Sequence, residues 1–213
     1  LREDLLEVDP SGDIIRKLVN DKDISVRSVI AQREDLLEID PSGEMIKKLL
    51  SPDEDVGVKL TIATYVDLLK VDPSGDIIRK LVYNENQEMR ETIARYQHLL
   101  GADPSGDIFR KLVKDESSLV RSAIAQRKEL LEVDPSGDII RDLANDKDDR
   151  VRHDIAVRED LLEIDPSGDI IRDLIANDEE GIIRSTLHDS NPDYASILQT
   201  EMILRKYISL VMS

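Results

Sequence analysis

The chain has 213 residues, of which 40% are hydrophobic and 35% charged, so it is too apolar for a disordered protein and has enough apolar side chains for a folded core. It contains no Cys, which excludes disulfides and thiolate metal sites, and no apolar run approaches the roughly 20 residues that cross a membrane. The net charge of −17, without a cluster of Lys and Arg, argues against nucleic acid as a partner. We expect no membrane partner and take the cytoplasm as the default compartment.

The first nine residues, Leu-Arg-Glu-Asp-Leu-Leu-Glu-Val-Asp, match residues 32–40 at almost every position. The sequence therefore begins in the second half of a unit that recurs further along the chain. We expect that an N-terminal part of the protein precedes Leu1 in preference to a natural start at this residue.

The tetrapeptide Asp-Pro-Ser-Gly divides the chain into repeats. It occurs six times at intervals of 31 or 32 residues, beginning at Asp9, Asp40, Asp72, Asp103, Asp134 and Asp165. A fixed period of this length is typical of a solenoid, in which a repeat buries its apolar face only against its neighbours. The period predicts an architecture and does not identify a partner.

Each tetrapeptide precedes a predicted short helix, helix A. In the first repeat Asp9 or Ser11 is a suitable N-terminal cap, and Pro10 fits the first helical turn, where its missing N–H costs nothing. The apolar stripe of this helix consists of Ile14, Ile15, Leu18 and Val19. We interpret the six Ser of the motif as helix caps and not as nucleophiles, because no His recurs with them.

A polar turn then leads to a second predicted helix, helix B, with Asp23 as its candidate cap. Its apolar stripe contains Val26, Ile30 and Leu37. Position 33 interrupts this stripe, and its residues in the first five repeats are Arg33, Tyr65, Tyr96, Arg127 and Arg158. Either helix B continues through this position, where a long side chain covers apolar surface, or it ends near Gln32 and a separate short turn follows. We favour one continuous helix.

A polar residue in the turn between the helices precedes a basic residue of helix B by six positions. The pairs are Asp21–Arg27, Asp53–Lys59, Asn84–Arg90, Asp115–Arg121, Asp146–Arg152 and Asp178–Arg184. The second and sixth repeats carry an inserted residue, and the interval is still six. We therefore expect a ladder in which each Asp accepts hydrogen bonds from its own Arg, a neighbouring Arg or N–H groups of helix B.

The turn Asp, the pairs Val26-Arg27 and Ile30-Ala31, the two Leu and the Asp-Pro before the next helix resemble HEAT-like repeats, in particular the short type named after phycobilin lyases. The resemblance covers residues 1–189, and the six copies are in register. It implies an all-α fold, a right-handed α-solenoid of about six two-helix repeats of 31–32 residues, in which the B helices line the concave surface. A variant leucine-rich repeat, which shares Val-Arg-x-x-x-Ala but has a shorter period, ranks second.

Residues 190–213 depart from the repeat. Asn191-Pro192 opens a predicted final helix that extends to about Val211. Its apolar face consists of Ile197, Leu198, Leu204, Ile208 and Val211. A terminal repeat has to cover its last apolar face, so we interpret this helix as a cap, with dimerisation as the alternative.

The six repeats differ most along one stripe of helix B, at the equivalents of positions 25, 28, 29 and 32. On helix A, by contrast, position 13 is always acidic and position 16 always basic. We interpret the variable stripe as a partner-binding surface; the alternative is that packing between repeats constrains helix A and leaves helix B free to vary. The candidate binding residues are Leu60, Glu88, Glu91, Arg95, Leu119, Gln126, Arg150 and His153.

The sequence favours a non-enzymatic scaffold that binds another protein or a peptide on the concave surface of its B helices. We expect no catalytic residue, cofactor or metal: His153-Asp154 and His188-Asp189 only faintly resemble the His-Glu pairs of HEAT-like di-iron hydroxylases. Most of the negative charge belongs to the framework that the repeats share, so we infer no site for basic ligands. The alternatives are a HEAT-like enzyme or enzyme subunit of the lyase type, and a purely structural spacer.

Overall fold

The computed structural model describes residues 9–178 and 181–212, with side chains as far as Leu204. Over these residues the chain consists of helices and turns without a strand, which confirms the all-α prediction. The chain divides into two compact units, residues 1–104 and residues 105–213. The half-repeat expected at residues 1–8 lies outside the described residues.

Two helices follow every tetrapeptide, and in the first five repeats a one-turn helix follows them. The A helices are α2 (Asp13–Leu18), α5 (Glu44–Leu49), α8 (Asp76–Leu81), α11 (Asp107–Leu112), α14 (Asp138–Ala144) and α17 (Asp169–Ala176). The B helices are α3 (Ile24–Ala31), α6 (Val56–Tyr65), α9 (Gln87–Ala94), α12 (Ser118–Ala125), α15 (Asp149–Ala156) and α18 (Ile182–Ser190). The one-turn helices are α4 (Leu36–Ile39), α7 (Leu68–Val71), α10 (Leu99–Ala102), α13 (Leu130–Val133) and α16 (Leu161–Ile164).

Each Asp-Pro-Ser-Gly forms a tight turn before helix A, and its Asp is the main cap of that helix. In the first repeat one Asp9 carboxylate oxygen accepts the Ile14 N–H at 2.7 Å and the other accepts the Ser11 hydroxyl at 2.7 Å. Ser11 Oγ accepts the Asp13 N–H at a longer 3.3 Å, so Ser11 mainly orients the carboxylate. The helix begins at Asp13, and the prediction that Pro10 lies in the first helical turn is wrong.

These hydrogen bonds stabilise the charged form of the capping carboxyls. The Ile14 N–H is the main cause of a lowered pKa at Asp9, followed by the Ser11 hydroxyl. At Asp72 the Ser74 hydroxyl is the main cause of a lowered pKa, and burial acts in the opposite direction. A carboxyl whose pKa is lower in the folded than in the unfolded chain stabilises the fold above its ordinary pKa and loses this contribution as the pH falls.

The Gly of the tetrapeptide is required by both backbone and packing. Gly106 has a φ of 76°, in the left-handed region that residues with a side chain avoid. A Cβ atom at this position would lie 2.2 Å from Cγ1 of Val133, the last residue before the next tetrapeptide. In the sixth repeat Ile197 of the final helix takes the equivalent place over Gly168. Each turn is thus closed by a residue from the far end of its own repeat.

Helix B ends at or before position 33, so the prediction of one continuous helix is wrong. α3 ends at Ala31 and α4 begins at Leu36, and the later repeats break at or just after the same place. Arg33 is buried, and its guanidinium forms an ion pair with Asp35 in the connecting turn. Because the partner is two residues away, the pair favours a turn over a continuing helix.

In the third repeat Tyr96 stands at the same position. Its hydroxyl forms hydrogen bonds with the segment where α6 ends and α7 begins in the second repeat. Its hydroxyl donates to Asp67 Oδ1 at 2.8 Å and accepts the Leu69 N–H at 3.2 Å. Burial, followed by the hydrogen bond to Asp67, raises the pKa of Tyr96. Tyr194 does the same in the second unit, where its hydroxyl accepts the Leu161 N–H at 3.1 Å.

We expect Tyr96→Phe to lower the free energy of unfolding by about 1 kcal/mol, because it removes a hydroxyl that joins two elements. Tyr65→Phe, the equivalent change at a side chain that is 59% exposed, should have no measurable effect. Urea denaturation of both variants checks this prediction. Equal losses would show that the Tyr96 hydroxyl has no specific role.

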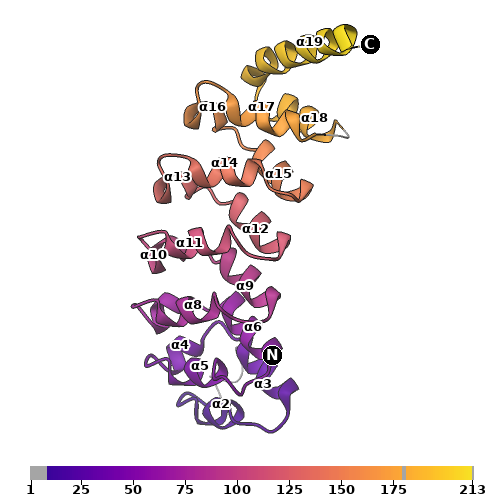
Figure 1. Cartoon of the computed structure of the whole chain (residues 1–213). Helices are drawn as coiled ribbons and strands as arrows, with labels where there is room; N and C mark the ends of the chain where they lie inside the picture. The colour runs from indigo at the N-terminus through magenta and orange to yellow at the C-terminus, as the bar shows by residue number, and fades with distance from the viewer. Residues whose placement is uncertain (1–8, 179–180, 213) are drawn as a thin grey trace. The chain divides into compact units, whose positions relative to one another are not determined.

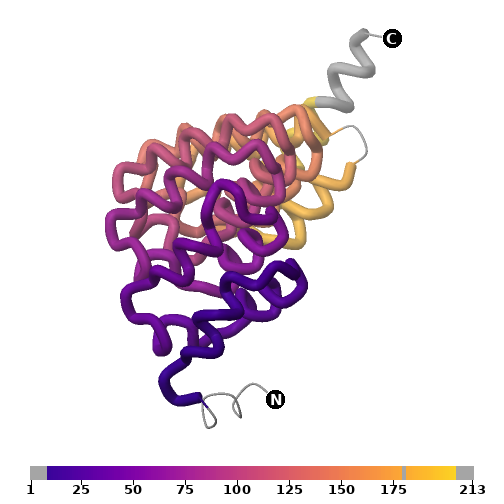
Figure 2. Tube along the Cα trace, turned by 90° about the horizontal axis from the view of Figure 1, so that it is seen from below, coloured from indigo at the N-terminus to yellow at the C-terminus, as the bar shows by residue number. Residues whose placement is uncertain are grey.

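Within each unit the A helices and the B helices form two layers with aliphatic side chains between them. In the second unit α15 packs against α12 and α18, and α14 packs against α17. Figure 1 shows these helices with α13 and α16 beyond the A helices, and Figure 2 shows the repeated back-and-forth course of the chain in this unit, magenta to yellow. The one Phe of the chain, Phe109, is fully buried in this core.

The chain after α18 forms a 3-10 helix, η1 (Pro192–Tyr194), and then α19 (Ala195–Met212), as predicted for a final helix. α19 packs against α17 and α18, and Leu198 is buried there. Leu204, which was predicted to lie on the same apolar face, is 48% exposed. Its neighbours Met202 and Ile203 are 64% and 62% exposed. The side chains of Ile208 and Val211 lie outside the described residues.

Candidate interaction surface

The B helices lie side by side within each unit and carry the eight candidate binding residues. The first unit contains α3, α6 and α9, and the second contains α12, α15 and α18. In each unit we name as the helix-B face the residues equivalent to positions 25, 28, 29 and 32. The candidates of the first unit are Leu60, Glu88, Glu91 and Arg95, and those of the second are Leu119, Gln126, Arg150 and His153.

The helix-B face of the first unit combines charged and apolar side chains. Glu88 is exposed, whereas Leu60 and Glu91 are partly buried. Arg95, at the C-terminal end of α9, is exposed and forms an ion pair with Glu91 at 3.2 Å. Glu88 forms no ion pair with the residues that the structure describes, so its charge is available to a partner.

Part of the helix-B face in the second unit is used by contacts between helices. Asp154 of α15 accepts the Ser122 hydroxyl and, at 3.1 Å, the side-chain amide of Gln126, both from α12. Ser122 is buried and Leu119 is partly buried. In this unit the variable stripe, interpreted from the sequence as a partner-binding surface, is therefore only partly available to a partner, and the differences between repeats gave no sign of the role of Asp154.

The constant charges of helix A have a structural cause. Arg79 donates to the Ala102 carbonyl at 3.0 Å and forms an ion pair with Asp76 at 3.1 Å. Arg16 likewise donates to the Ile39 carbonyl at 2.6 Å. These guanidinium groups fasten helix A to the end of its own repeat. Constancy at positions 13 and 16 thus reflects framework contacts, and the contrast with helix B does not by itself identify a binding surface.

The turn residues and the helix-B arginines form a ladder in which Arg27, Arg121 and Arg152 each join two repeats. Nε and Nη2 of Arg121 bind the Asp146 carboxylate of the next repeat at 2.6 and 2.8 Å. Nη1 donates to the backbone carbonyl of Asp115 in its own repeat at 2.8 Å. The hydrogen bond to Asp146 is the main cause of a raised pKa at Arg121. The own-repeat contact is therefore made to the carbonyl of the turn residue.

The inserted residue of the second repeat changes the partner in the ladder. Nη2 of Arg27 binds Glu54 at 2.8 Å, and Nε binds the same carboxylate at 2.9 Å. The predicted pair Asp53–Lys59 is not formed, since the Lys59 ammonium donates to the Pro52 carbonyl at 3.3 Å. The six-residue interval is kept, but the insertion places Glu54 where the other repeats have their turn Asp.

A hollow of about 470 Å³ borders the helix-B face of the first unit, at the ends of α6 and α9. Its lining includes Arg95, the exposed Tyr65, Tyr96 and His98. The rings of Tyr96 and His98 meet edge to face with centroids 5.9 Å apart, and His98 Nε2 lies 3.8 Å from Asp67 Oδ2. Sequence reasoning placed only Arg95 here; the available signal was the change from Arg to Tyr at position 33 in two successive repeats.

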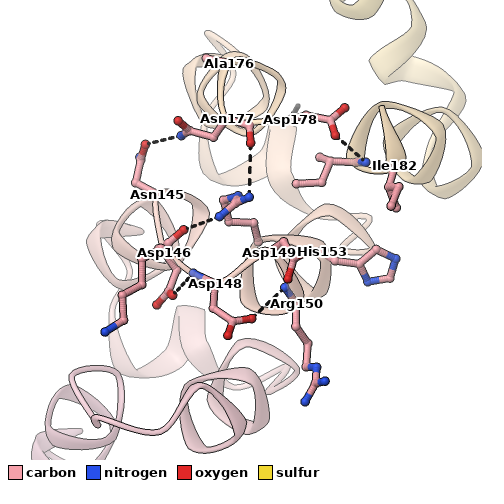
Figure 3. Close-up of a pocket in the computed structure, with 13 residues that line it drawn as sticks. Asn145, Asp146, Asp148, Asp149, Arg150, His153, Ala176, Asn177, Asp178 and Ile182 are labelled. Carbon is pink, nitrogen blue, oxygen red and sulfur yellow. Dashed lines mark hydrogen bonds between the residues drawn. The ribbon is translucent and has the colours of Figure 1, made fainter. Parts of the chain in front are cut away.

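A larger hollow of about 820 Å³ lies in the second unit, between the turns that precede α15 and α18. Arg150 and His153 line it, and Figure 3 shows both side chains extending outward from α15. Ile182, which is 53% exposed, also lines it from the start of α18. The structure thus brings together two of the predicted residues, and it adds Arg152 and Asn177, which the stripe pattern missed because they belong to the ladder and the turn.

Within the described part of the chain, no group of three or more His, Cys, Asp or Glu side chains is arranged to hold a metal ion. None of the helices described combines the length and the hydropathy that a membrane crossing requires. No family model matches the chain, and no curated protein matches it. The two helix-B faces and the hollows beside them form the candidate site.

Proposed function

We propose that the chain is a HEAT-like, right-handed α-solenoid of about six repeats that binds another protein or a peptide and has no enzymatic activity. The partner contacts the helix-B faces, which in such repeats form the concave surface, and the final helix caps the array. The recurring pair of helices A and B after each Asp-Pro-Ser-Gly supports the assignment to this class. The cytoplasm is the expected compartment.

The single observation that carries this proposal is that helix B presents side chains that the framework does not use. Glu88 and Arg150 are exposed, differ from their equivalents in other repeats, and form no ion pair with the described residues. Arg150 also borders the hollow of about 820 Å³. Arginine beside a concave surface is a common centre of binding energy in protein interfaces. The arginines of helix A, by contrast, are held by carbonyl groups.

The test starts from capture of a partner by the intact chain and its identification by mass spectrometry. We expect Arg150→Glu to weaken the affinity of that partner about thirty-fold or more, because the change removes an exposed anchor and reverses its charge. The free energy of unfolding should change by less than about 0.5 kcal/mol, since the side chain is exposed and makes no framework contact. Titration calorimetry and denaturant melts measure the two quantities.

Asp142→Lys is the matched control, because Asp142 is exposed on helix A of the same repeat. Glu88→Lys and Lys80→Glu form a second such pair in the first unit, where Lys80 is exposed on α8. Arg79 is unsuitable as a control because it holds the Ala102 carbonyl. Loss of binding in the helix-A variants alone would show that the partner binds the helix-A side, and unchanged binding in all four would show that it contacts neither of these surfaces.

A further inference from the structure

Arg27 and Arg121 share one binding geometry. In each, Nη1 donates to the backbone carbonyl of the turn residue six positions earlier, at 2.6 and 2.8 Å. Nε and Nη2 hold a carboxylate of the next repeat, from Glu54 and Asp146 respectively. This fork is the arrangement in which a guanidinium binds a carboxylate most strongly.

Arg152, one repeat after Arg121, has only part of this arrangement. Nη1 donates to the Asp146 carbonyl at 2.8 Å, and Nη2 reaches the Asn177 carbonyl at 3.3 Å. Nε is buried and has no hydrogen-bond partner. Among the described residues no carboxylate pairs with this guanidinium, so its charge lacks the neutralisation that the other two arginines receive, which is unfavourable for a partly buried cation.

Two acids of the sixth repeat correspond to Asp146. Glu179 matches Glu54 of the second repeat, which has the same insertion, but it lies outside the described residues. Asp178 matches by the six-residue interval, and it is occupied elsewhere. Its carboxylate accepts the Gly181, Ile183 and Arg184 N–H groups at 3.0 to 3.3 Å. It also accepts Nε of Arg184 at 2.9 Å. Asp178 therefore caps the start of α18 and pairs within its own repeat. It makes no hydrogen bond to Nε or Nη2 of Arg152.

Arg152 lines the hollow of about 820 Å³, and the balance of charged side chains around this hollow favours an anion. Of the acids that line it, Asp146 pairs with Arg121 and Asp178 with Arg184. The charged side chains that remain are Asp148, Asp149, Lys147, Arg150 and Arg152. Three cations therefore face two carboxylates, which leaves one positive charge for a guest.

We propose that the fork of Arg152 receives a carboxylate of the bound partner, in the manner in which Asp146 occupies the fork of Arg121. This inference rests on the proposed function, because it assigns the chemistry of the partner at one place on the second unit. The carboxylate belongs to an Asp or Glu side chain or to a C-terminal residue. Residues of the partner next to it then meet Ile182, which is 53% exposed, and Arg150.

The test uses the side-chain Nε–H signals of the arginines in proton–nitrogen correlation spectra, with sodium acetate as the probe and sodium chloride at equal ionic strength as the blank. We expect acetate to displace the Arg152 signal to saturation and to leave the signals of Arg27 and Arg121 in place, because their forks are filled. In Arg152→Lys, which keeps the charge and removes the fork, acetate binding is followed through the backbone amide signals of Asn177 and Ile182, which line the same hollow, and should be at least about tenfold weaker. An Arg152 signal that acetate moves no more than chloride does overturns the proposal.

Two further arms test the source of the anion. Glu179 and Glu180 follow Asp178 directly in the sequence, so the double variant Glu179→Gln, Glu180→Gln is titrated as well. If the unaltered chain ignores acetate and this variant binds it, the chain fills its own fork and the proposal is wrong. A larger displacement by sodium phosphate than by acetate at equal concentration also overturns the assignment to a carboxylate.

Two blocked peptides separate the possible carboxylates. Acetyl-glutamate methylamide carries only the side-chain carboxylate, and acetyl-alanyl-alanine carries only the C-terminal one. The peptide that displaces the Arg152 signal at the lower concentration identifies the source, and a response to neither contradicts the proposal. None of these titrations needs the partner, so the two proposals can fail separately. A saturable response of Arg152, with partner binding unaffected in the helix-B variants, would contradict the proposed function and support the anion site. A flat titration with loss of binding in those variants would do the reverse.

Discussion

Asp146→Ala should lower the free energy of unfolding by about 3–5 kcal/mol, because it leaves the guanidinium of Arg121 buried without its carboxylate. Arg121 is 5% exposed, so water cannot replace the lost partner. The same carboxylate accepts the Asp148 N–H at 2.8 Å, and its loss also weakens the turn that leads into α15. Guanidinium chloride denaturation at neutral pH measures the difference.

Two variants separate the ladder from ordinary surface charge. The Asp138 carboxylate is 77% exposed and lies 3.2 Å from Arg141, so Asp138→Ala should cost less than about 1 kcal/mol. The double variant Arg121→Met, Asp146→Leu should regain most of the stability that Asp146→Ala loses, because no charge is left buried. Small and equal losses in the two Asp→Ala variants would show that the ladder contributes little.

Gly106→Ala should destabilise the second unit for two reasons that act together. A residue with a side chain at a φ of 76° costs about 1–2 kcal/mol. The new Cβ atom would lie 2.2 Å from Val133 Cγ1, and displacement of that side chain costs about 1–3 kcal/mol more. Thermal and denaturant unfolding give the total, and combination with Val133→Ala relieves the second cost alone.

Gly57→Ala provides a control of the opposite sign. Gly57 belongs to α6 and is not among the glycines with positive φ, and the nearest atom to its added Cβ is a flexible carboxylate oxygen of Asp55 at 3.0 Å. Alanine is favoured over glycine in a helix by about 1 kcal/mol, so stability should be unchanged or higher. A similar loss in both variants would mean that any added methyl group is harmful and that the turn geometry of Gly106 has no special role.

The apolar periodicity was sufficient to predict helices A and B, because the stripe residues that it selects are largely those that the layers bury. Ile15, Val19 and Ile30 are all buried, although Ile14 of the same stripe is 42% exposed. The break after helix B could not be read from the periodicity. It depends on the contact of Arg33 with a carboxylate two residues away, which a helical pattern does not register.

The six-residue interval predicted that turn and arginine meet, and it did not specify which atoms do so. Arg121 could contact its own turn residue, Asp115, through the carboxylate or through the backbone carbonyl. In the structure it donates to the carbonyl. The carboxylate of Asp146, 25 residues away, is then left to cross between repeats. Spacing along the chain thus fixes a neighbourhood, while the choice of atom follows from the three-dimensional path.

The candidate site was predictable to the extent that exposure follows helical phase. Glu88 and Arg150 are exposed, whereas Ser122 on the same stripe is buried and donates a hydrogen bond to Asp154. Nothing in the sequence indicated the contact of Arg79, because its carbonyl partner Ala102 lies 23 positions away and leaves no local pattern. Contacts of this kind appear only when the repeat is folded back on itself.

The closure of each Asp-Pro-Ser-Gly turn by the end of its own repeat has a consequence for synthesis. When Gly106 emerges from the ribosome, Val133 is still inside the exit tunnel, so the turn is open on the side that Val133 later covers. Closure of each turn therefore follows its emergence by nearly one repeat, and a nascent chain carries one open turn nearest the exit tunnel. In the sixth repeat the turn at Gly168 is closed by Ile197, so α19 has to emerge before this turn is covered.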